Sequence, residues 1–175
     1  MQYYITANEI TLINHLYKVK VELRAKDFFT HKVVAKCDFY ISRTETCLLD
    51  KIKTAKQFRR QGIAKNLIDT MENYDNQNNI KYINGIFGPE SQDVISAKNF
   101  YDEMGYDIVD EGSCLVKILD KKKDKQSTIN VPIYWTKTVY KPRSYYEPLD
   151  TIKDSTLTQE YNTDLSCLEL TKKRP

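Results

Sequence analysis

The hydrophobic and polar residues of this chain follow two different periods. In Leu16–Arg24 every second residue is apolar, and Lys32–Ile41 is a second run of strand-forming residues. A period of two is typical of half-buried strands, and the charged, aromatic turn Lys26–Phe29 between the runs predicts a hairpin. Cys47–Thr54 is the next strand candidate. Ahead of the hairpin, Ala7–His15 is weakly helical in pattern.

The period changes to that of a helix near residue 63. Ile63, Leu67, Met71 and Tyr74 recur at helical spacing and predict a long amphipathic helix. A second helical stripe follows, made of Val94, Ala97, Phe100, Tyr101 and Met104. Gly105 comes directly after this stripe, which is typical of the residue that ends a helix in the left-handed conformation.

Three further strand candidates, Ile80–Phe87, Tyr106–Asp110 and Ser113–Leu119, surround the second helix. The chain therefore reads as antiparallel strands followed by a strand-helix-strand-helix-strand unit. This order predicts an α+β fold with a mixed sheet. With 175 residues, one domain over 1–119 is expected, followed by a C-terminal extension over 120–175.

A basic loop precedes the first helix and opens it. Its residues are Phe58, Arg59, Arg60, Gln61, Gly62, Ile63 and Ala64. A helix start presents unpaired backbone N–H groups and the positive end of the helix dipole, and both attract a phosphate anion. Gly62 allows close approach of the backbone, and Arg59, Arg60 and Lys65 add positive charge. The loop therefore predicts a cradle for a pyrophosphate.

The pattern Arg59-x-x-Gly62-x-Ala64 resembles the Arg/Gln-x-x-Gly-x-Gly/Ala signature of the GNAT superfamily of acyl-CoA-dependent N-acyltransferases. The segment from Ala97 to Tyr106 resembles a second segment of that family, and the two occur in the family's order and spacing. The resemblance covers about residues 30–119. It implies the GNAT fold, in which the cofactor lies between two splayed parallel strands, and it implies acetyl-CoA as cosubstrate.

The resemblance also implies which residues hold acetyl-CoA. Backbone groups of Ile52, Lys53 and Thr54 would pair with the pantetheine arm like an added strand. Backbone amides from Arg59 through Gln61, Gly62 and Ile63 to Ala64 would face the pyrophosphate. Val94 stands where many relatives have a cofactor-binding asparagine, so Lys98 or Asn99 would substitute for it.

Two side chains are candidates for proton transfer. Tyr101 matches the tyrosine that the family uses as general acid toward the leaving thiolate. The alternative for Tyr101 is one more aromatic residue on a core-facing stripe. Asp50 precedes Ile52 on the same strand and is the candidate general base, with Glu90 as the second candidate. The alternative for Asp50 is a solvated carboxylate, and some family members need no protein base.

Composition bears on where the protein is located and on whether it binds a metal. No apolar run is long enough for a membrane span, and the N-terminus lacks the pattern of a secretory signal, so a cytoplasmic protein is expected. The cysteines at 37, 47, 114 and 167 form no C-x-x-C pair and no grouping with His15 or His31, so no metal site is predicted. Reduced cysteines that act as small core residues are the expected reading.

The net charge of +3 comes entirely from residues 120–175, because residues 1–119 carry equal numbers of acidic and basic side chains. Within the extension, residues 121–146 combine lysines with Tyr134, Trp135 and Tyr140. Lysine neutralises phosphate and aromatic rings stack on bases, so this segment is a candidate RNA-binding surface. The alternative is a solvated charge run beside a strand that buries its aromatic residues. A strand here would also offer an edge for pairing in a homodimer.

The sequence therefore supports an N-acetyltransferase that moves an acetyl group from acetyl-CoA to a primary amine. The acceptor stays open among a protein, a small molecule and an RNA-linked aminoacyl group. The alternative is a non-catalytic module of the same fold that binds a protein or nucleic-acid partner. One departure from the family bears on the acceptor: the region before the hairpin is too short for the helices that GNAT proteins usually place there.

Overall fold

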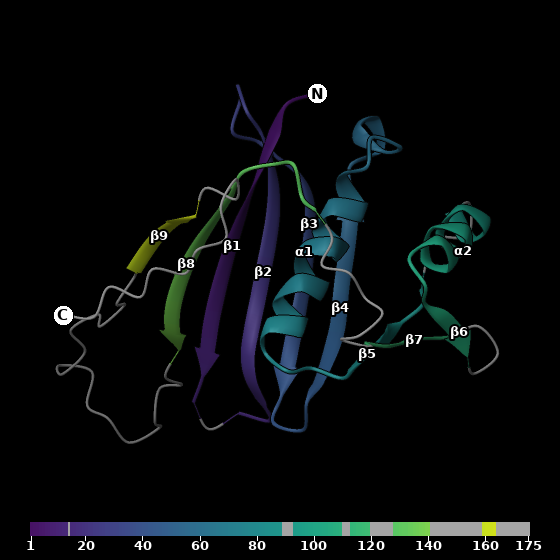
Figure 1. Cartoon of the computed structure of the whole chain (residues 1–175). Coiled ribbons are helices and arrows are strands. Elements are labelled where there is room, and N and C mark those ends of the chain that lie inside the picture. Colours follow the sequence, from purple (N-terminus) through teal and green to yellow (C-terminus); the bar gives the residue numbers. More distant parts are fainter. Residues whose placement is uncertain (14, 89–92, 110–112, 120–127, 141–158, 164–175) are drawn as a thin grey trace, which may run out of the picture.

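The computed structural model describes residues 1–13, 15–88, 93–109, 113–119, 128–140 and 159–163. These residues form one mixed sheet of nine strands in the order β6-β7-β5-β4-β3-β2-β1-β8-β9 (Figure 1). The strands are β1 (Tyr3–Leu12), β2 (Tyr17–Asp27), β3 (Val33–Ser42), β4 (Thr46–Thr54), β5 (Tyr82–Ile86), β6 (Asp107–Val109), β7 (Cys114–Ile118), β8 (Ile133–Tyr140) and β9 (Gln159–Thr163). The helices are α1 (Ile63–Gln77) and α2 (Val94–Glu103), and a short 3₁₀ turn spans Lys56–Phe58. The α+β prediction is confirmed.

The helix expected over Ala7–His15 is wrong, because this stretch belongs mostly to β1. β1 pairs antiparallel with β2 along nearly its whole length and parallel with β8 on its other side. Two neighbouring strands thus satisfy its backbone groups, and this pairing overrides a weak helical pattern. β1 to β4 form an antiparallel meander, and the hairpin expected between β2 and β3 is confirmed. β1 leads into β2 with no helix among the described residues between them.

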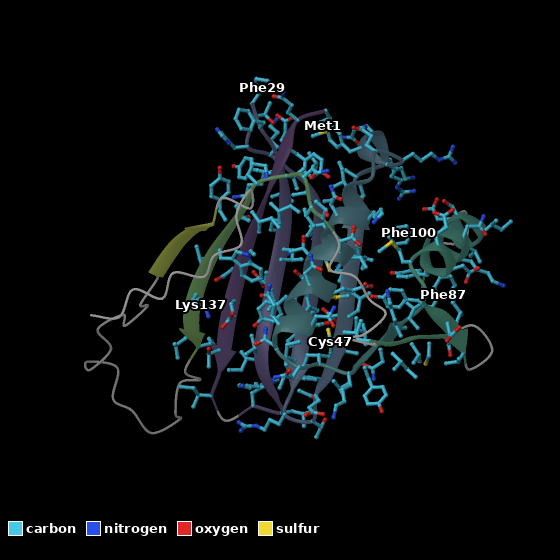
Figure 2. All side chains as sticks on the ribbon, viewed as in Figure 1. Met1, Phe29, Cys47, Phe87, Phe100 and Lys137 are labelled. Atoms are coloured by element: carbon cyan, nitrogen blue, oxygen red, sulfur yellow. The ribbon has the colours of Figure 1, made fainter. Side chains whose placement is uncertain are left out.

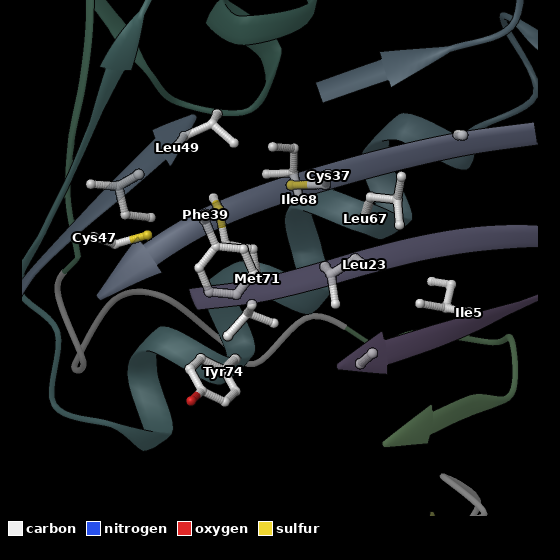
Figure 3. Packing of buried hydrophobic residues seen from close by; sticks show 14 of the residues in the cluster. Ile5, Leu23, Cys37, Phe39, Cys47, Leu49, Leu67, Ile68, Met71 and Tyr74 are labelled. Carbon is white, nitrogen blue, oxygen red and sulfur yellow. The ribbon is translucent and has the colours of Figure 1, made fainter. Parts of the chain in front are cut away.

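α1 covers one face of the meander and makes the core with it (Figure 3). Ile63, Leu67, Met71 and Tyr74 are buried, so the predicted helical stripe is confirmed. They pack against apolar residues at every second position of the strands, such as Phe39 on β3. The period of 3.6 in the helix and the period of 2 in the strands bring two apolar surfaces together.

β4 and β5 are parallel neighbours for only four residue pairs, from Thr46↔Tyr82 to Leu49↔Gly85. Gly85 allows their close contact, because a Cβ atom there would lie 2.8 Å from the carbonyl oxygen of Leu49. Beyond this pair no ladder joins the two strands. The edge of β4 that faces β5 is therefore unpaired from Asp50 onward, where the site lies.

α2 lies beyond β5, at the end of the sheet formed by β6 and β7 (Figure 1). It ends as predicted, with Gly105 at a φ of 75°. A polar cluster connects this end to α1: Tyr106 donates to the Glu72 carboxylate (2.9 Å), which also accepts from Lys117 (2.8 Å). Lys117 donates as well to the carbonyl oxygen of Met104, just after α2. These bonds hold the C-terminal end of α2 against the core.

Part of the C-terminal extension joins the same sheet through β8, a strand that belongs to the alternative reading of this segment. Ile133 is buried, and the Trp135 ring stacks on that of Tyr74 in α1 with 5.3 Å between centroids. Lys137 pairs with Glu9 of β1 (3.3 Å). Trp135 and Lys137 are thus engaged within the fold, while 120–127 and 141–158, which hold most lysines of the candidate RNA-binding segment, lie outside the described residues. Among the described helices, none is long and apolar enough to cross a membrane.

Candidate functional site

A cavity of about 1100 Å³ opens where β4 and β5 separate. Its walls are the unpaired edge of β4, the loop and first turn of α1, the end of β5 and one side of α2. Phe87 and Phe100 line it, and Figure 2 shows Phe100 on the side of α2 that faces β4. It is thus bounded by elements that are distant in the sequence but brought together by the parallel crossover.

The loop before α1 has the backbone shape of an anion cradle. Arg60 and Gly62 both have positive φ angles, 60° and 74°, and α1 begins at the next residue, Ile63. Alternation of ordinary and left-handed residues turns successive N–H groups toward one point, which is how backbone nests bind anions. The first helical hydrogen bond runs from the Asn66 amide to the Gly62 carbonyl, so the amides of residues 63–65 have no helical acceptor. A Cβ atom at Gly62 would meet nothing within 4 Å, so the positive φ is what requires glycine here.

The basic side chains of the loop and first helical turn differ in the ion pairs that they make. Arg59 contacts Asp93 at the start of α2 (2.8 Å), and its Nε donates to the Thr54 carbonyl (3.3 Å). Lys65 contacts Asp69 one turn further along α1 (2.6 Å). Arg60 is exposed and has no ion pair within the described part of the chain. Arg59 therefore bridges the two walls of the cavity, and Arg60 keeps its charge available at the mouth.

Two local features mark the β4 wall of the cavity. Opposite β4, Asp38 pairs with Lys51 and Phe39 pairs with Leu49, so Asp50 is the extra residue of a β-bulge. The bulge lies where β5 departs, and Asp50 is exposed and lines the cavity. The hydroxyl oxygen of Thr54 is buried with no hydrogen-bond partner among the described residues.

Tyr101 is the residue of α2 that the core buries, and it also lines the cavity. Its ring makes edge contacts with Phe87, Phe100 and Tyr106 at centroid distances of 5.2 to 6.0 Å. Burial raises the pKa of the Tyr101 phenol well above its ordinary value. The phenol is therefore neutral at physiological pH and holds a proton that it can donate, although the same burial makes it a weaker acid.

The structure brings together in one cavity residues that sequence reasoning selected from three segments: β4, the loop and first turn of α1, and α2. The lining includes the candidates Asp50, Ile52, Lys53, Thr54, Arg59, Arg60, Gly62, Ile63, Ala64, Lys65, Asn99 and Tyr101. Gln61 is exposed and stands outside the lining, and Glu90 lies outside the described residues.

The same cavity contains residues that sequence reasoning missed. Asp93 pairs with Arg59, and Ile86 and Ile95 are largely exposed apolar residues on the cavity wall. An acidic residue directly before an apolar helical stripe is a helix-start signal that would have drawn attention to Asp93. No sequence pattern marks Ile86 and Ile95, because apolar residues on a strand and a helix are ordinarily core residues.

No family model matches the chain, and no curated protein matches it in sequence. Among solved structures, a GNAT-family acetyltransferase from Staphylococcus aureus is similar, with a TM-score of 0.50 and 19% identity over 58% of this chain and 68% of that one. A GNAT-family acetyltransferase from Elizabethkingia anophelis with acetyl-CoA bound has a TM-score of 0.48 and 18% identity over 57% of this chain and 76% of that one. An N-acetyltransferase from Thermoplasma acidophilum in complex with coenzyme A has a TM-score of 0.48 and 16% identity, over 57% and 61%.

At these identities the similarity concerns the architecture. The splay of β4 from β5 and the left-handed Gly62 before α1 are features of this chain's own geometry. The chain therefore has the fold of the GNAT superfamily of N-acetyltransferases.

Proposed function

We propose that this protein transfers an acetyl group from acetyl-CoA to a primary amine. The observation that carries the proposal is the cavity between the diverging strands, which has an anion cradle at one end and Tyr101 in its wall. A cradle alone would suit many phosphorylated ligands. An unpaired strand edge beside it suits a ligand that continues from its phosphates into an extended, amide-containing arm.

In this proposal the amides of residues 63–65 and the Arg60 guanidinium hold the pyrophosphate, and the β4 edge over Ile52, Lys53 and Thr54 pairs with the pantetheine arm. Acetyl-CoA supplies the acetyl group as a thioester. The acceptor nitrogen forms the new bond to the acetyl carbon while the carbon–sulfur bond breaks. Asp50, directly or through water, takes the proton that the nitrogen loses, and Tyr101 donates a proton to the departing thiolate.

Binding of acetyl-CoA is tested by calorimetric titration of the full chain and two variants at one position. Gly62→Asn places a neutral side chain in the cradle, and Gly62→Asp places a carboxylate of nearly the same shape there. Both residues tolerate a positive φ better than most, and the space around Gly62 is open. We expect Gly62→Asn to retain most binding and Gly62→Asp to lose it, because the carboxylate repels the pyrophosphate.

Thermal unfolding gives an independent readout of the same binding. A ligand present at a hundred times its dissociation constant adds about 2.7 kcal/mol to the stability of the protein that binds it. Acetyl-CoA that neither releases heat nor raises the melting temperature would overturn the transferase proposal. Equal weakening by Asn and Asp would mean that the cradle shape matters and that phosphate does not bind at its amides.

Tyr101→Phe separates catalysis from binding. We expect acetyl-CoA affinity to stay within about threefold and kcat to fall by about two orders of magnitude, because a general acid contributes about 10²- to 10⁴-fold. A variant with unchanged kcat would limit Tyr101 to packing. A non-catalytic module would bind acetyl-CoA without transferring its acetyl group to any amine.

A further inference from the structure

The face of the sheet opposite α1 is polar and is covered by none of the described helices. On β3, Cys37 and Phe39 are fully buried against α1, so Lys36 and Asp38 lie on the other face. β2 alternates in the same way, with Leu23 buried and its neighbours Glu22 and Arg24 on the opposite side. This open face reaches the cavity at β4.

Three lysines come together on the open face at the border of the cavity. Residues directly opposite one another in antiparallel strands share a face, and Lys53 of β4 is the partner of Lys36. Lys51 is the partner of Asp38 on the same face. Lys51 and Lys53 also line the cavity. We call Lys36, Lys51 and Lys53 the three-lysine patch.

The charge of this patch is uncompensated within the described part of the chain. Asp38 is the one carboxylate directly opposite a member of the patch, and it forms an ion pair with Arg24. Glu22, the next acidic residue on this face, contacts Lys20 and Arg24. Neither of these two carboxylates makes an ion pair with Lys36, Lys51 or Lys53. Asp50, which lies on β4 with Lys51 and Lys53, makes no ion pair with the three lysines either.

Lys36 and Lys53 stand directly opposite each other, with Cβ atoms about 5 Å apart by strand geometry, and like charges in this arrangement destabilise a sheet. An anion that bridges the two ammonium groups removes this repulsion and forms charge-assisted hydrogen bonds with both. Without an anion, the repulsion between the two ammonium groups destabilises the sheet. A bound anion removes this repulsion and adds hydrogen bonds.

We propose that the acceptor amine carries an anionic group, a phosphate or a carboxylate, that binds the three-lysine patch. This inference rests on the proposed acetyltransferase function and identifies the class of acceptor. The acceptor then spans a short distance along β4, with its amine at Asp50 and its anionic group at the lysines. An amine without an anionic group cannot make these contacts with the lysines.

The experiment compares three acceptors of similar length: 2-aminoethyl phosphate, 3-aminopropanoate and 2-aminoethanol. Each is tested with the unmodified chain, with Lys36→Gln and with Lys18→Gln. Lys36 lies outside the cavity lining, and Lys18 is an exposed lysine of β2 that serves as the matched control. Comparison between protein variants cancels the differences in basicity among the three amines.

We expect Lys36→Gln to raise KM for an anionic acceptor about tenfold. The kcat, the KM for the neutral acceptor and the KM for acetyl-CoA should stay unchanged. Lys18→Gln should change none of these values. A larger effect of Lys36→Gln on KM for 2-aminoethyl phosphate identifies a phosphate, and a larger effect on KM for 3-aminopropanoate identifies a carboxylate. Equal effects of Lys36→Gln on charged and neutral acceptors, or equal effects of Lys36→Gln and Lys18→Gln, would overturn the inference.

Two further measurements keep the inference separate from the proposed function. NMR titration of the full chain with 2-aminoethyl phosphate should shift the amides of Lys36, Lys51 and Lys53 whether or not transfer occurs, and shifts confined to residues 60–65 would overturn it. Binding of acetyl-CoA and of its 3′-dephospho form to Lys36→Gln is the second measurement. If Lys36→Gln weakened the binding of acetyl-CoA but not that of its 3′-dephospho form, the patch would bind the 3′-phosphate of the cosubstrate. That result would overturn the acceptor inference.

Discussion

Asp75 of α1 is the most deeply buried acidic residue in the described part of the chain. Its side chain is fully buried, and apart from the Cys47 thiol neither carboxylate oxygen has a hydrogen-bond partner among the described residues. Burial raises the pKa of Asp75 to about 8, although the Cys47 thiol lowers it, and the nearby Glu72 carboxylate adds a smaller rise. The folded protein therefore favours the neutral acid, while the unfolded chain ionises near the ordinary value.

This difference predicts how stability depends on pH. Because the folded pKa is raised, the contribution of Asp75 is fully present below about pH 4 and is lost as pH rises toward about 8, by at most about 1.4 kcal/mol per pH unit. Asp75→Asn should therefore gain stability relative to the unmodified chain between pH 5 and pH 8. Urea unfolding at several pH values measures this.

Asp27→Asn is the matched control for Asp75→Asn. Hydrogen bonds from Thr30 lower the pKa of Asp27, so this carboxyl group is ionised in both states across the same range. The free energy of unfolding of Asp27→Asn should differ from that of the unmodified chain by a constant amount between pH 5 and pH 8. A constant difference for Asp75→Asn as well would show that Asp75 titrates normally in the folded protein.

Among the elements, the contact between β4 and β5 decides where the cavity opens. Gly85→Ala should destabilise the fold by about 1 to 3 kcal/mol, because its Cβ atom would meet the Leu49 carbonyl oxygen at 2.8 Å and a backbone atom cannot turn aside. Gly88→Ala is the control, since a Cβ atom there meets nothing within 4 Å. Denaturant unfolding of both variants gives the comparison, and equal losses would show that the close approach is unimportant.

The elements that sequence patterns predicted well are those whose apolar period was long and regular. The α1 stripe from Ile63 to Tyr74 and the β2–β3 hairpin are of this kind, and both are confirmed. β1 was missed because the segment from Tyr3 to Leu12 gains its strand partners from elsewhere. β2 lies on one side of it, and β8, more than a hundred residues later in the chain, lies on the other.

At the scale of the whole molecule, β8 extends the sheet beyond β1. Trp135→Ala should destabilise the whole fold by about 2 kcal/mol, because it removes the ring that stacks on Tyr74 and covers the end of α1. Val139→Ala, an exposed position on the same strand, should change stability by less than about 0.5 kcal/mol.

Thermal unfolding of both β8 variants checks this prediction. A single shifted transition for Trp135→Ala is expected if β8 unfolds together with the meander. If Trp135→Ala left the melting temperature of the main transition unchanged, β8 would instead be an independent addition to the fold, separable from residues 1–119.

The sequence by itself predicted the start of α1 after Gly62, the strand before it and the end of α2 at Gly105, because each depends on short-range spacing. Only the tertiary structure decided that Asp93 pairs with Arg59 and that Lys36 stands opposite Lys53. It also decided that no described helix covers the lysine-bearing face. Strand register and the separation of β4 from β5 depend on contacts between segments far apart in the chain, and the order of residues along one segment does not contain them.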